Sequence, residues 1–406
     1  MPPPVQPPLI GVAALMRRAF AGEDLTQQGA DLLARAQANP HDAHAWMDLS
    51  TVLQLTGNRT DALVVQREAI AMQALYTLPT RTDTATGLRL LAIMGLGDLM
   101  ANTPIEFLVA NSDVTLDLLY LSAEADWPAQ VPDHDVLLVA VAESAVSQPL
   151  LRRLATDLMN WPRPVLNRPE LIAVLSRDGA GAALQTINGV AMPLTVRISR
   201  ADLLRVAQGA LAIPALLTDG DLPIIVRPTG SHAGQQLDKI SDLAALSAYL
   251  EKTDADNFYL SRFVDYRSSD GQFRKYRICL IGGVPYLCHL AISSHWMIHY
   301  LNAGMTDEAS KRVEEAQCMA DFEQGFARRH AGALQAIDAR IGLPYLGIDC
   351  AETQSGELLI FEIDNAMLVH DMDPEPMFSY KKPAMRKLFA GFRALLQTHR
   401  KTCGIA

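Results

Sequence analysis

The sequence predicts a multidomain protein of mixed α/β and α+β class, and three observations support this prediction. Apolar residues recur at helical spacing over residues 9–78, and beyond them buried-strand runs alternate with helix-like stretches. Further along the chain, strand-like runs come in pairs joined by tight turns. We therefore expect a helical segment over residues 1–80, a small parallel α/β domain over residues 85–193 and two α+β lobes over residues 194–400.

The composition is that of a globular protein. The chain of 406 residues has room for two or three domains, and 49% of its residues are hydrophobic against 20% charged. A net charge of −10 argues against nucleic acid or an anionic membrane as the main partner. The five cysteines form no C-x-x-C pair, so neither a disulfide framework nor a zinc site is suggested. Without a long apolar run or a signal-like start, the sequence predicts a cytoplasmic protein.

The helical segment resembles one tetratricopeptide repeat of about 34 residues. Trp46, Leu49, Leu63 and Ala69 stand at suitable spacings, with Gly57 at the bend. A plain helical hairpin explains the same pattern equally well. A single repeat cannot bury its apolar face alone, so flanking helices or the next domain must cover it. Both interpretations suggest a docking module for a peptide or protein.

The α/β domain is predicted from alternating strands and helices, a pattern typical of a parallel sheet. Strands are expected over residues 88–94, 116–121, 136–141 and 164–167, and helices over residues 149–158 and 168–184. Gly95-Leu96-Gly97 is not a dinucleotide-binding fingerprint, because Met100 stands at the third glycine position.

Three acidic residues are expected to meet on one face of a hairpin near the C-terminus. Two strand-like runs flank the turn dipeptide Ser355-Gly356. If these two residues form the loop, Asp349 lies opposite Glu362, and Asp364 shares their face. Like charges so close need cations, and hard oxygen ligands suit Mg²⁺. The alternative is a solvated hairpin edge, and a slip of one residue in register would scatter the acids.

A second candidate site follows the strand predicted over residues 223–228. Arg227 lies in this strand, and the small residues from Thr229 to Gly234 form a loop. Small residues let backbone N–H groups approach a phosphate, and the arginine supplies positive charge. The loop lacks the Gly-Lys-Ser/Thr of a P-loop, and an ordinary turn is an equal alternative. A helix is predicted over residues 237–250.

Another hairpin is predicted over residues 273–292, with Gly282-Gly283 as its turn. Alternation with period two puts Lys275 and Arg277 on one face, and Arg274, Tyr276 and His289 on the other. Arginines inside an otherwise apolar hairpin are costly unless they meet an anion. Pairing with surface acids is the alternative.

The segments after this hairpin show no zinc motif. His295 and His299 lie four residues apart but lack the glutamate of a zinc-protease helix, so zinc is not expected. Helices are predicted over residues 321–341 and 385–398.

These features occur in an order that resembles the ATP-grasp superfamily, and within it the branch of ribosomal-protein glutamate ligases and glutathione synthetases. The resemblance is strongest at Gly347-Ile348-Asp349 and residues 361–365, then at Val226-Arg227-Pro228 with Ser231 and Gly234. It covers residues 88–396 and leaves the helical segment as an addition. It implies an ATP-grasp fold, in which two α+β lobes clamp ATP, preceded by a small α/β domain.

The resemblance also implies a nucleotide and metal site. Asp349, Glu362 and Asp364 are the implied ligands of Mg²⁺ ions that bridge the ATP phosphates. The implied contacts to the nucleotide are made by Arg177, Arg227, Ser231, His232, Gly234 and Asp265. Arg177 and Arg227 replace lysines of the family, and Asp364 replaces its common asparagine, so charge or oxygen ligand is kept. Ser261-Arg262 replaces acids that often precede the hinge between the lobes.

Catalytic and substrate roles follow from the same resemblance. Arg277 matches the arginine that stabilises the acyl-phosphate, with Lys275 or Arg274 assisting. The family's substrate-facing segment runs through His289, His295 and His299, which become candidates for binding a carboxylate or deprotonating an amine. A core or surface histidine is the alternative for each.

The implied activity is that of an ATP-dependent carboxylate–amine ligase. A carboxylate attacks the γ-phosphate, and an amine then attacks the acyl-phosphate, giving an amide or peptide bond, ADP and phosphate. The expected partners are a small-molecule amine and carboxylate, with a docked peptide or protein and a homo-oligomer left open. The alternatives are a non-catalytic adaptor with a degenerate ATP-grasp platform and an ATP-grasp phosphotransferase.

Overall fold

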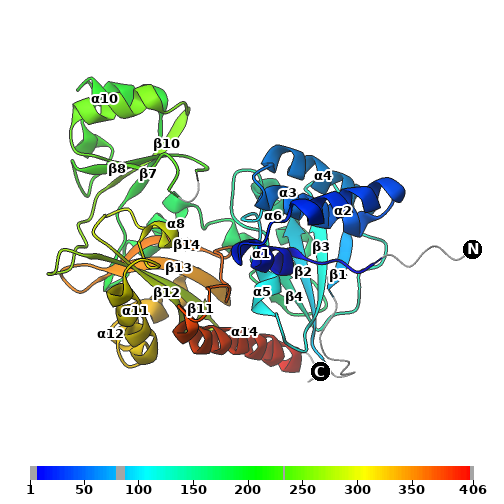
Figure 1. Ribbon diagram of the computed structural model, residues 1–406. Helices are drawn as coiled ribbons and strands as arrows, with labels where there is room; N and C mark the ends of the chain where they lie inside the picture. The colour runs from blue at the N-terminus through cyan, green and yellow to red at the C-terminus, as the bar shows by residue number, and fades with distance from the viewer. Residues whose placement is uncertain (1–6, 79–86, 232–233, 403–406) are drawn as a thin grey trace, which may run out of the picture.

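The computed structural model describes residues 7–78, 87–231 and 234–402 and has a mixed α/β fold. Three sheets organise the chain (Figure 1), with strand orders β1-β3-β2-β4-β5, β7-β10-β8-β9 and β12-β11-β13-β14-β6. The first sheet lies with the N-terminal helices on one side of the molecule, and the other two lie on the opposite side. No helix in these ranges is both long and apolar enough to cross a bilayer.

Four helices open the chain. They are α1 (Val12–Phe20), α2 (Thr26–Ala38), α3 (Ala43–Leu55) and α4 (Arg59–Met72). The Asp42 side chain caps α3 by accepting a hydrogen bond from the Ala45 N–H at 3.0 Å. Met47 of α3 and Ala69 of α4 are buried in one core with the first sheet. The apolar face of the helical segment is therefore covered by the next part of the chain.

The first sheet is parallel except at one edge. Its strands are β1 (Leu75–Leu78), β2 (Arg89–Gly95), β3 (Thr115–Leu121), β4 (Val136–Val139) and β5 (Val165–Leu166). The even residues of β2 pack towards α3 and α4, and the odd ones pack towards α6 (Gln148–Asp157). The short helix α5 (Ile105–Leu108) follows β2. The parallel sheet is as predicted, but Leu75–Leu78, predicted to be helical, pairs antiparallel with β3.

The second sheet is entirely antiparallel. It contains β7 (Thr195–Ser199), β8 (Ile224–Pro228), β9 (Asp238–Ile240) and β10 (Asn257–Arg262), with α9 (Arg200–Ala207), η1 (Ile213–Ala215) and α10 (Leu243–Lys252). The helix predicted over residues 237–250 starts later, because Asp238–Ile240 pairs with β8 instead. Asp242 then caps α10 by accepting from the Ala245 N–H at 2.8 Å.

The third sheet holds the two predicted hairpins. Its strands are β6 (Val190–Ala191), β11 (Phe273–Ile281), β12 (Val284–Ser293), β13 (Tyr345–Glu352) and β14 (Leu358–Asp364). The helices around it are α7 (Pro169–Ile172), α8 (Arg177–Leu184), α11 (Ala309–Asp321), α12 (Phe326–Arg329), α13 (Ala331–Ile341) and α14 (Lys382–Thr402), with η2 (Tyr300–Asn302) and η3 (Ser379–Lys381). The helices predicted over residues 168–184 and 321–341 are thus each broken into shorter pieces.

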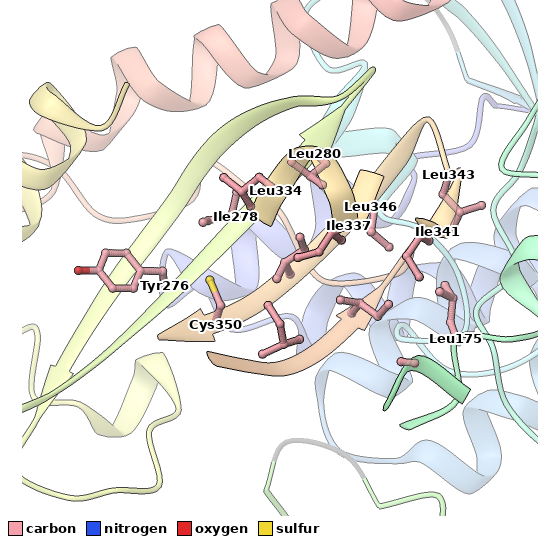
Figure 2. Close-up of a cluster of buried hydrophobic side chains, with 14 of the residues drawn as sticks. Leu175, Tyr276, Ile278, Leu280, Leu334, Ile337, Ile341, Leu343, Leu346 and Cys350 are labelled. Atoms are coloured by element: carbon pink, nitrogen blue, oxygen red, sulfur yellow. The ribbon is translucent and has the colours of Figure 1, made fainter. Parts of the chain in front are cut away.

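The two faces of the third sheet have different surroundings. Figure 2 shows Ile278 and Leu280 of β11 beside Leu346 of β13, packed with Leu334 and Ile337 of α13. The opposite face meets α14, which is buried along one side against β11, β12 and the first sheet. Beyond α14, the same face of β11 carries charged side chains, and these line the cavity described below.

We predict that Phe392 of α14 is needed for stability. Its side chain is fully buried, and its ring meets the Tyr345 ring edge-on at 5.6 Å between centroids. Replacing Phe392 with Ala leaves a cavity in the core that α14 shares with the first and third sheets. The free energy of unfolding should therefore fall by about 3–5 kcal/mol. Urea denaturation measures this change.

The matched control is Val146→Ala, because Val146 is 85% exposed. It should change the free energy of unfolding by less than about 0.5 kcal/mol. Equal effects of the two substitutions would contradict the role of α14 as a shared core element.

Candidate functional site

A cavity of about 450 Å³ lies between the second and third sheets. One wall is formed by side chains of β7, β8 and β10, and the other by side chains of β11 to β14. The cavity is lined by the three predicted acids and by two of the predicted cations: Asp349, Glu362, Asp364, Lys275 and Arg277. The cavity is therefore the candidate site.

A row of four side chains crosses the third sheet at the base of this cavity. Backbone pairing places His289 opposite Arg277, Arg277 opposite Asp349, and Asp349 opposite Glu362. Directly opposed residues of antiparallel strands point to the same face with their Cβ atoms about 4.5–5.5 Å apart. All four side chains line the cavity. Each of the four neighbouring strands β12, β11, β13 and β14 therefore contributes one polar side chain to the row.

The predicted pairing of Asp349 with Glu362 is present, but by a different route. The loop has three residues rather than two, because the Thr353 N–H donates to the Glu357 carbonyl at 2.9 Å. This shifts the register by one residue near the turn. A β-bulge at Phe361 shifts it back, since Cys350 pairs with Ile360 whereas Asp349 pairs with Glu362. The two deviations cancel.

His289 was predicted on the wrong face. A second bulge lies at Cys288, because Ile278 pairs with Leu287 whereas Arg277 pairs with His289. The Gly282-Gly283 turn is as expected, with φ angles of 57° and 77°. The extra residue moves His289 from the face of Arg274 to that of Arg277.

Asp349 is the most enclosed acid of the row, with 1% of its surface exposed. Its Oδ1 accepts from Arg277 Nε at 2.8 Å, and its Oδ2 lies 2.9 Å from Arg277 Nη2 and 2.7 Å from Lys275 Nζ. Burial alone would raise the pKa of Asp349, but the charges and hydrogen bonds of Arg277 and Lys275 hold it well below its usual range. Asp349 is therefore ionised, and it orients both cations.

Glu362 and the two predicted nucleotide arginines form a second group. Arg177, at the start of α8, donates from Nη2 to Glu362 Oε1 at 2.5 Å and from Nη1 to the Phe361 carbonyl at 3.3 Å. Arg227 is 6% exposed and donates to Ser231 Oγ at 3.0 Å. Burial, and then the charge of Arg177, lower the pKa of Arg227 to about 10. Two arginines that repel each other beside a cavity are suited to an anion.

Asp364 differs from the other two acids. Its carboxylate accepts from the Ala366 N–H at 3.0 Å, and it has no ion-pair partner among the described residues. Burial, and then the charge of Glu362, raise the pKa of Asp364 to about 7. A half-buried carboxylate of this kind is stabilised by a cation.

Glu362 and Asp364 therefore fit a hard divalent cation such as Mg²⁺, because both are oxygen ligands, Asp364 has no ion pair among the described residues, and Arg177 engages Glu362 through Oε1. Asp349 fits less directly, since both of its oxygens are engaged by cations. Within the ranges described above, no group of three or more His, Cys, Asp or Glu side chains is arranged as a metal site. The acids share the cavity, and metal binding stays a prediction.

The other predicted residues fall into three groups. The cavity is also lined by Arg177, Arg227, Gly234, His289 and His299. Three others are engaged elsewhere: Arg274 pairs with Glu314 at 2.5 Å, Asp265 pairs with Arg267 at 2.5 Å, and His295 lies exposed beside Ser294. Ser231 reaches the site only through Arg227, and His232 lies outside the described residues.

Sequence reasoning missed an apolar part of the cavity. Its side chains include Met192, Ile225, Tyr259, Phe263, Val264 and Leu359. The Phe263 ring meets the Trp296 ring edge-on at 5.7 Å between centroids, and Lys239 Nζ lies 4.0 Å from the Phe263 centroid. Such a slot suits a flat aromatic ligand. Tyr259 and Ser261 lie two residues apart on β10, and both line the cavity. Their spacing of two, which puts them on one face of the strand, could be read from the sequence.

A buried polar network supports the segment over residues 296–302, which also lines the cavity. Glu315 is fully buried and accepts from the Tyr300 hydroxyl at 2.9 Å and the Tyr380 hydroxyl at 2.6 Å. Lys381 Nζ donates to the Tyr300 hydroxyl at 3.1 Å and pairs with Asp373 at 2.7 Å. These bonds hold Tyr300 beside His289, at 4.5 Å between ring centroids.

No family model matches the sequence, and no curated protein matches it either. Similar solved structures include a RimK domain protein ATP-grasp from Sphaerobacter thermophilus DSM 20745, with 16% identity over 76% of this chain and 99% of that chain and a TM-score of 0.45. The D-alanine-D-alanine ligase from Coxiella burnetii is 11% identical over 78% of this chain and 97% of that chain, with a TM-score of 0.47. The VanG D-Ala:D-Ser ligase from Enterococcus faecalis is 12% identical over 75% and 100%, with a TM-score of 0.43.

We predict that Asp349→Asn destabilises the protein strongly. The substitution leaves Arg277 and Lys275, whose side chains are only 21% and 19% exposed, without their counter-charge, so the free energy of unfolding should fall by about 3–5 kcal/mol at pH 7. The control is Asp270→Asn, which removes an exposed acid from Arg274 on the same strand. Its cost should stay below about 1 kcal/mol in urea denaturation. Similar costs would show that the row is not a structural constraint.

We predict a distinct pH dependence for Asp364. Its folded pKa, about 7, lies above the unfolded value, so Asp364 contributes a fall in the free energy of unfolding as pH rises from about 4 to about 7, alongside Asp48 and Glu106, whose pKa values burial raises to about 6 and about 7. Asp364→Asn removes the Asp364 share of this decline and should stabilise the protein at pH 8 by about 1–3 kcal/mol in the presence of a chelator. Urea denaturation at several pH values measures both effects.

The control for charge is Asp254→Asn, at an exposed position. It should follow the wild-type pH profile. Wild-type behaviour of Asp364→Asn over the same range would refute the raised pKa.

Proposed function

We propose that this protein is an ATP- and Mg²⁺-dependent carboxylate–amine ligase and that the cavity between the two sheets is its active site. The observation that supports this most is the charge arrangement of the cavity. Four cations, Arg177, Arg227, Lys275 and Arg277, line the same space as Asp364, a half-buried acid with no ion-pair partner among the described residues. A phosphate chain with a bound divalent cation is complementary to both charges.

The nucleotide is assigned to the side of the cavity nearest the second sheet. Arg227 and Arg177 provide guanidinium groups for phosphate oxygens, and Gly234 belongs to the loop beside them. The apolar slot around Phe263 and Val264 accommodates the base. Asp265 is not assigned to the ribose, because Arg267 engages its carboxylate.

Glu362 and Asp364 are assigned as the residues that hold Mg²⁺. When bound, the metal neutralises charge on the oxygens of the transferring phosphoryl group. Asp349 has a different role from the one expected of it. It holds Arg277 and Lys275 in place, so that their positive charge is directed at the cavity before any ligand arrives.

Arg277 and Lys275 are assigned to the reacting carboxylate. Their charges stabilise the negative charge that builds on the acyl-phosphate and on the departing phosphate. In the overall reaction the carboxylate loses one oxygen to phosphate, the amine loses a proton, and the new C–N bond closes the amide. ADP and phosphate are released.

His289 is assigned to the amine. Burial, and then the charges of Arg277 and Lys381, hold the pKa of His289 well below its usual range. The imidazole is therefore neutral at pH 7 and can accept a hydrogen bond from an amine. Arg274 and His295 are not assigned to a substrate, because they lie outside the cavity lining.

We predict a magnesium-dependent stabilisation by a non-hydrolysable ATP analogue. At about 100 times Kd the analogue should add about 2.7 kcal/mol, seen as a rise of a few degrees in Tm. Glu362→Gln should abolish the dependence on Mg²⁺, and Arg227→Met should weaken binding of the analogue. Arg274→Met is the matched control, since Arg274 lies on β11 but outside the cavity, and it should behave as wild type.

Product analysis separates the remaining functions. Release of ADP and free phosphate that requires both a carboxylate and an amine supports the ligase. Phosphate retained on a substrate would identify a phosphotransferase instead. No shift in Tm with ATP analogue and Mg²⁺ would refute nucleotide binding and favour a non-catalytic adaptor.

A further inference from the structure

One end of the cavity is built by the N-terminal half of the chain. Phe20, the last residue of α1, and Met100, which follows β2, both line it. These residues are 39% and 42% exposed, so both are accessible to a ligand in the cavity. The wall at this end is therefore supplied by α1 and by the segment after β2.

The segment after β14 connects this wall to the cations of the site. Arg277 Nη1 donates to the Leu368 carbonyl at 3.2 Å, so Leu368 lies directly beside the charged row. Two residues later, His370 meets Phe20 at 5.5 Å between ring centroids and Phe107 at 6.4 Å. The wall thus adjoins the part of the cavity assigned to the reacting carboxylate.

Helix α1 is anchored at both ends, so Phe20 has a fixed position. Asp48 accepts from the N–H groups of Ile10 at 2.9 Å and Gly11 at 3.0 Å, and Glu106 accepts from Ala13 at 2.8 Å. Near the other end, Arg17 pairs with Asp371 at 2.5 Å. A wall held in this way is preorganised for its ligand.

Gly11 is required by this anchoring. Its φ is +88°, and a Cβ atom there would lie 2.7 Å from Glu106 Oε2. Any larger residue would displace the carboxylate or the start of α1.

The chemistry of the wall is apolar. Phe20, Met100 and Leu368 provide an aromatic ring, a thioether and an aliphatic chain, groups that adapt to apolar side chains. Burial lowers the pKa of His370 to about 4, so its ring is neutral at pH 7. The charges near the wall are compensated in pairs, Arg17 with Asp371, Lys381 with Asp373 and Arg277 with Asp349.

We propose that α1, through Phe20, together with Met100 and Leu368, forms a subsite that selects a substrate with an apolar side chain. This inference rests on the ligase function proposed above and adds the class of substrate that it takes. The N-terminal helix is then a specificity element of the active site.

The experiment measures binding of free amino acids by calorimetry in the presence of the ATP analogue and Mg²⁺. The probes are L-leucine, L-phenylalanine, glycine and L-glutamate. Wild type should bind leucine or phenylalanine at least tenfold more tightly than glycine and glutamate. Phe20→Ala should weaken that binding about tenfold or more, which is the effect of losing one large apolar contact. The Kd of the ATP analogue should change less than twofold.

Two further variants keep the test decisive if Phe20→Ala does not fold. Phe20→Leu keeps an apolar wall and should give an intermediate Kd, and Met100→Ala should weaken binding in the same direction as Phe20→Ala. The matched control is Met159→Ala, since Met159 is 64% exposed and lies outside the cavity lining. It should bind all probes as wild type does.

The outcomes separate the two proposals. Absence of analogue binding by wild type would overturn the ligase function itself. Analogue binding with no preference for apolar amino acids, or with a preference that all variants keep, would overturn the subsite and leave the ligase function standing.

Discussion

The row of His289, Arg277, Asp349 and Glu362 across four strands is the constraint on which the site depends. Asp349 is almost wholly buried, and a buried carboxylate is tolerated only when its charge is compensated. Arg277 and Lys275 supply this compensation and are themselves fixed by it. The same contact therefore ties β11 to β13 and keeps two cations pointing into the cavity.

The cavity also contains charges outside this row that lack a full counter-charge. Arg177 and Arg227 repel each other, and Asp364 has no ion-pair partner among the described residues. A ligand that carries both phosphate and a divalent cation would supply an anion to the two arginines and a cation to Asp364. The proposal of a nucleotide with its metal, rather than a simple anion or a bare cation, rests on this pair of charges.

The N-terminal helices are part of the architecture rather than an attachment to it. Helices α3 and α4 cover one face of the first sheet, and α1 reaches the cavity with Phe20. An isolated repeat must bury its face somewhere, and here the parallel sheet provides the surface. The predicted cover of this apolar face by the next domain is thus present, and the role of docking module stays a prediction.

Much of this protein could be predicted from its sequence, because strand and helix periodicity is local. The parallel sheet, both hairpins and the Gly282-Gly283 turn follow from alternation and turn chemistry. Only the tertiary structure decided which face His289 takes and how Asp349 comes to lie opposite Glu362. Each depends on a bulge, and a bulge is set by pairing between strands, which a count along one strand does not contain. The engagement of Asp265 and Arg274 away from the cavity and the arrival of Phe20 were likewise settled by contacts in space.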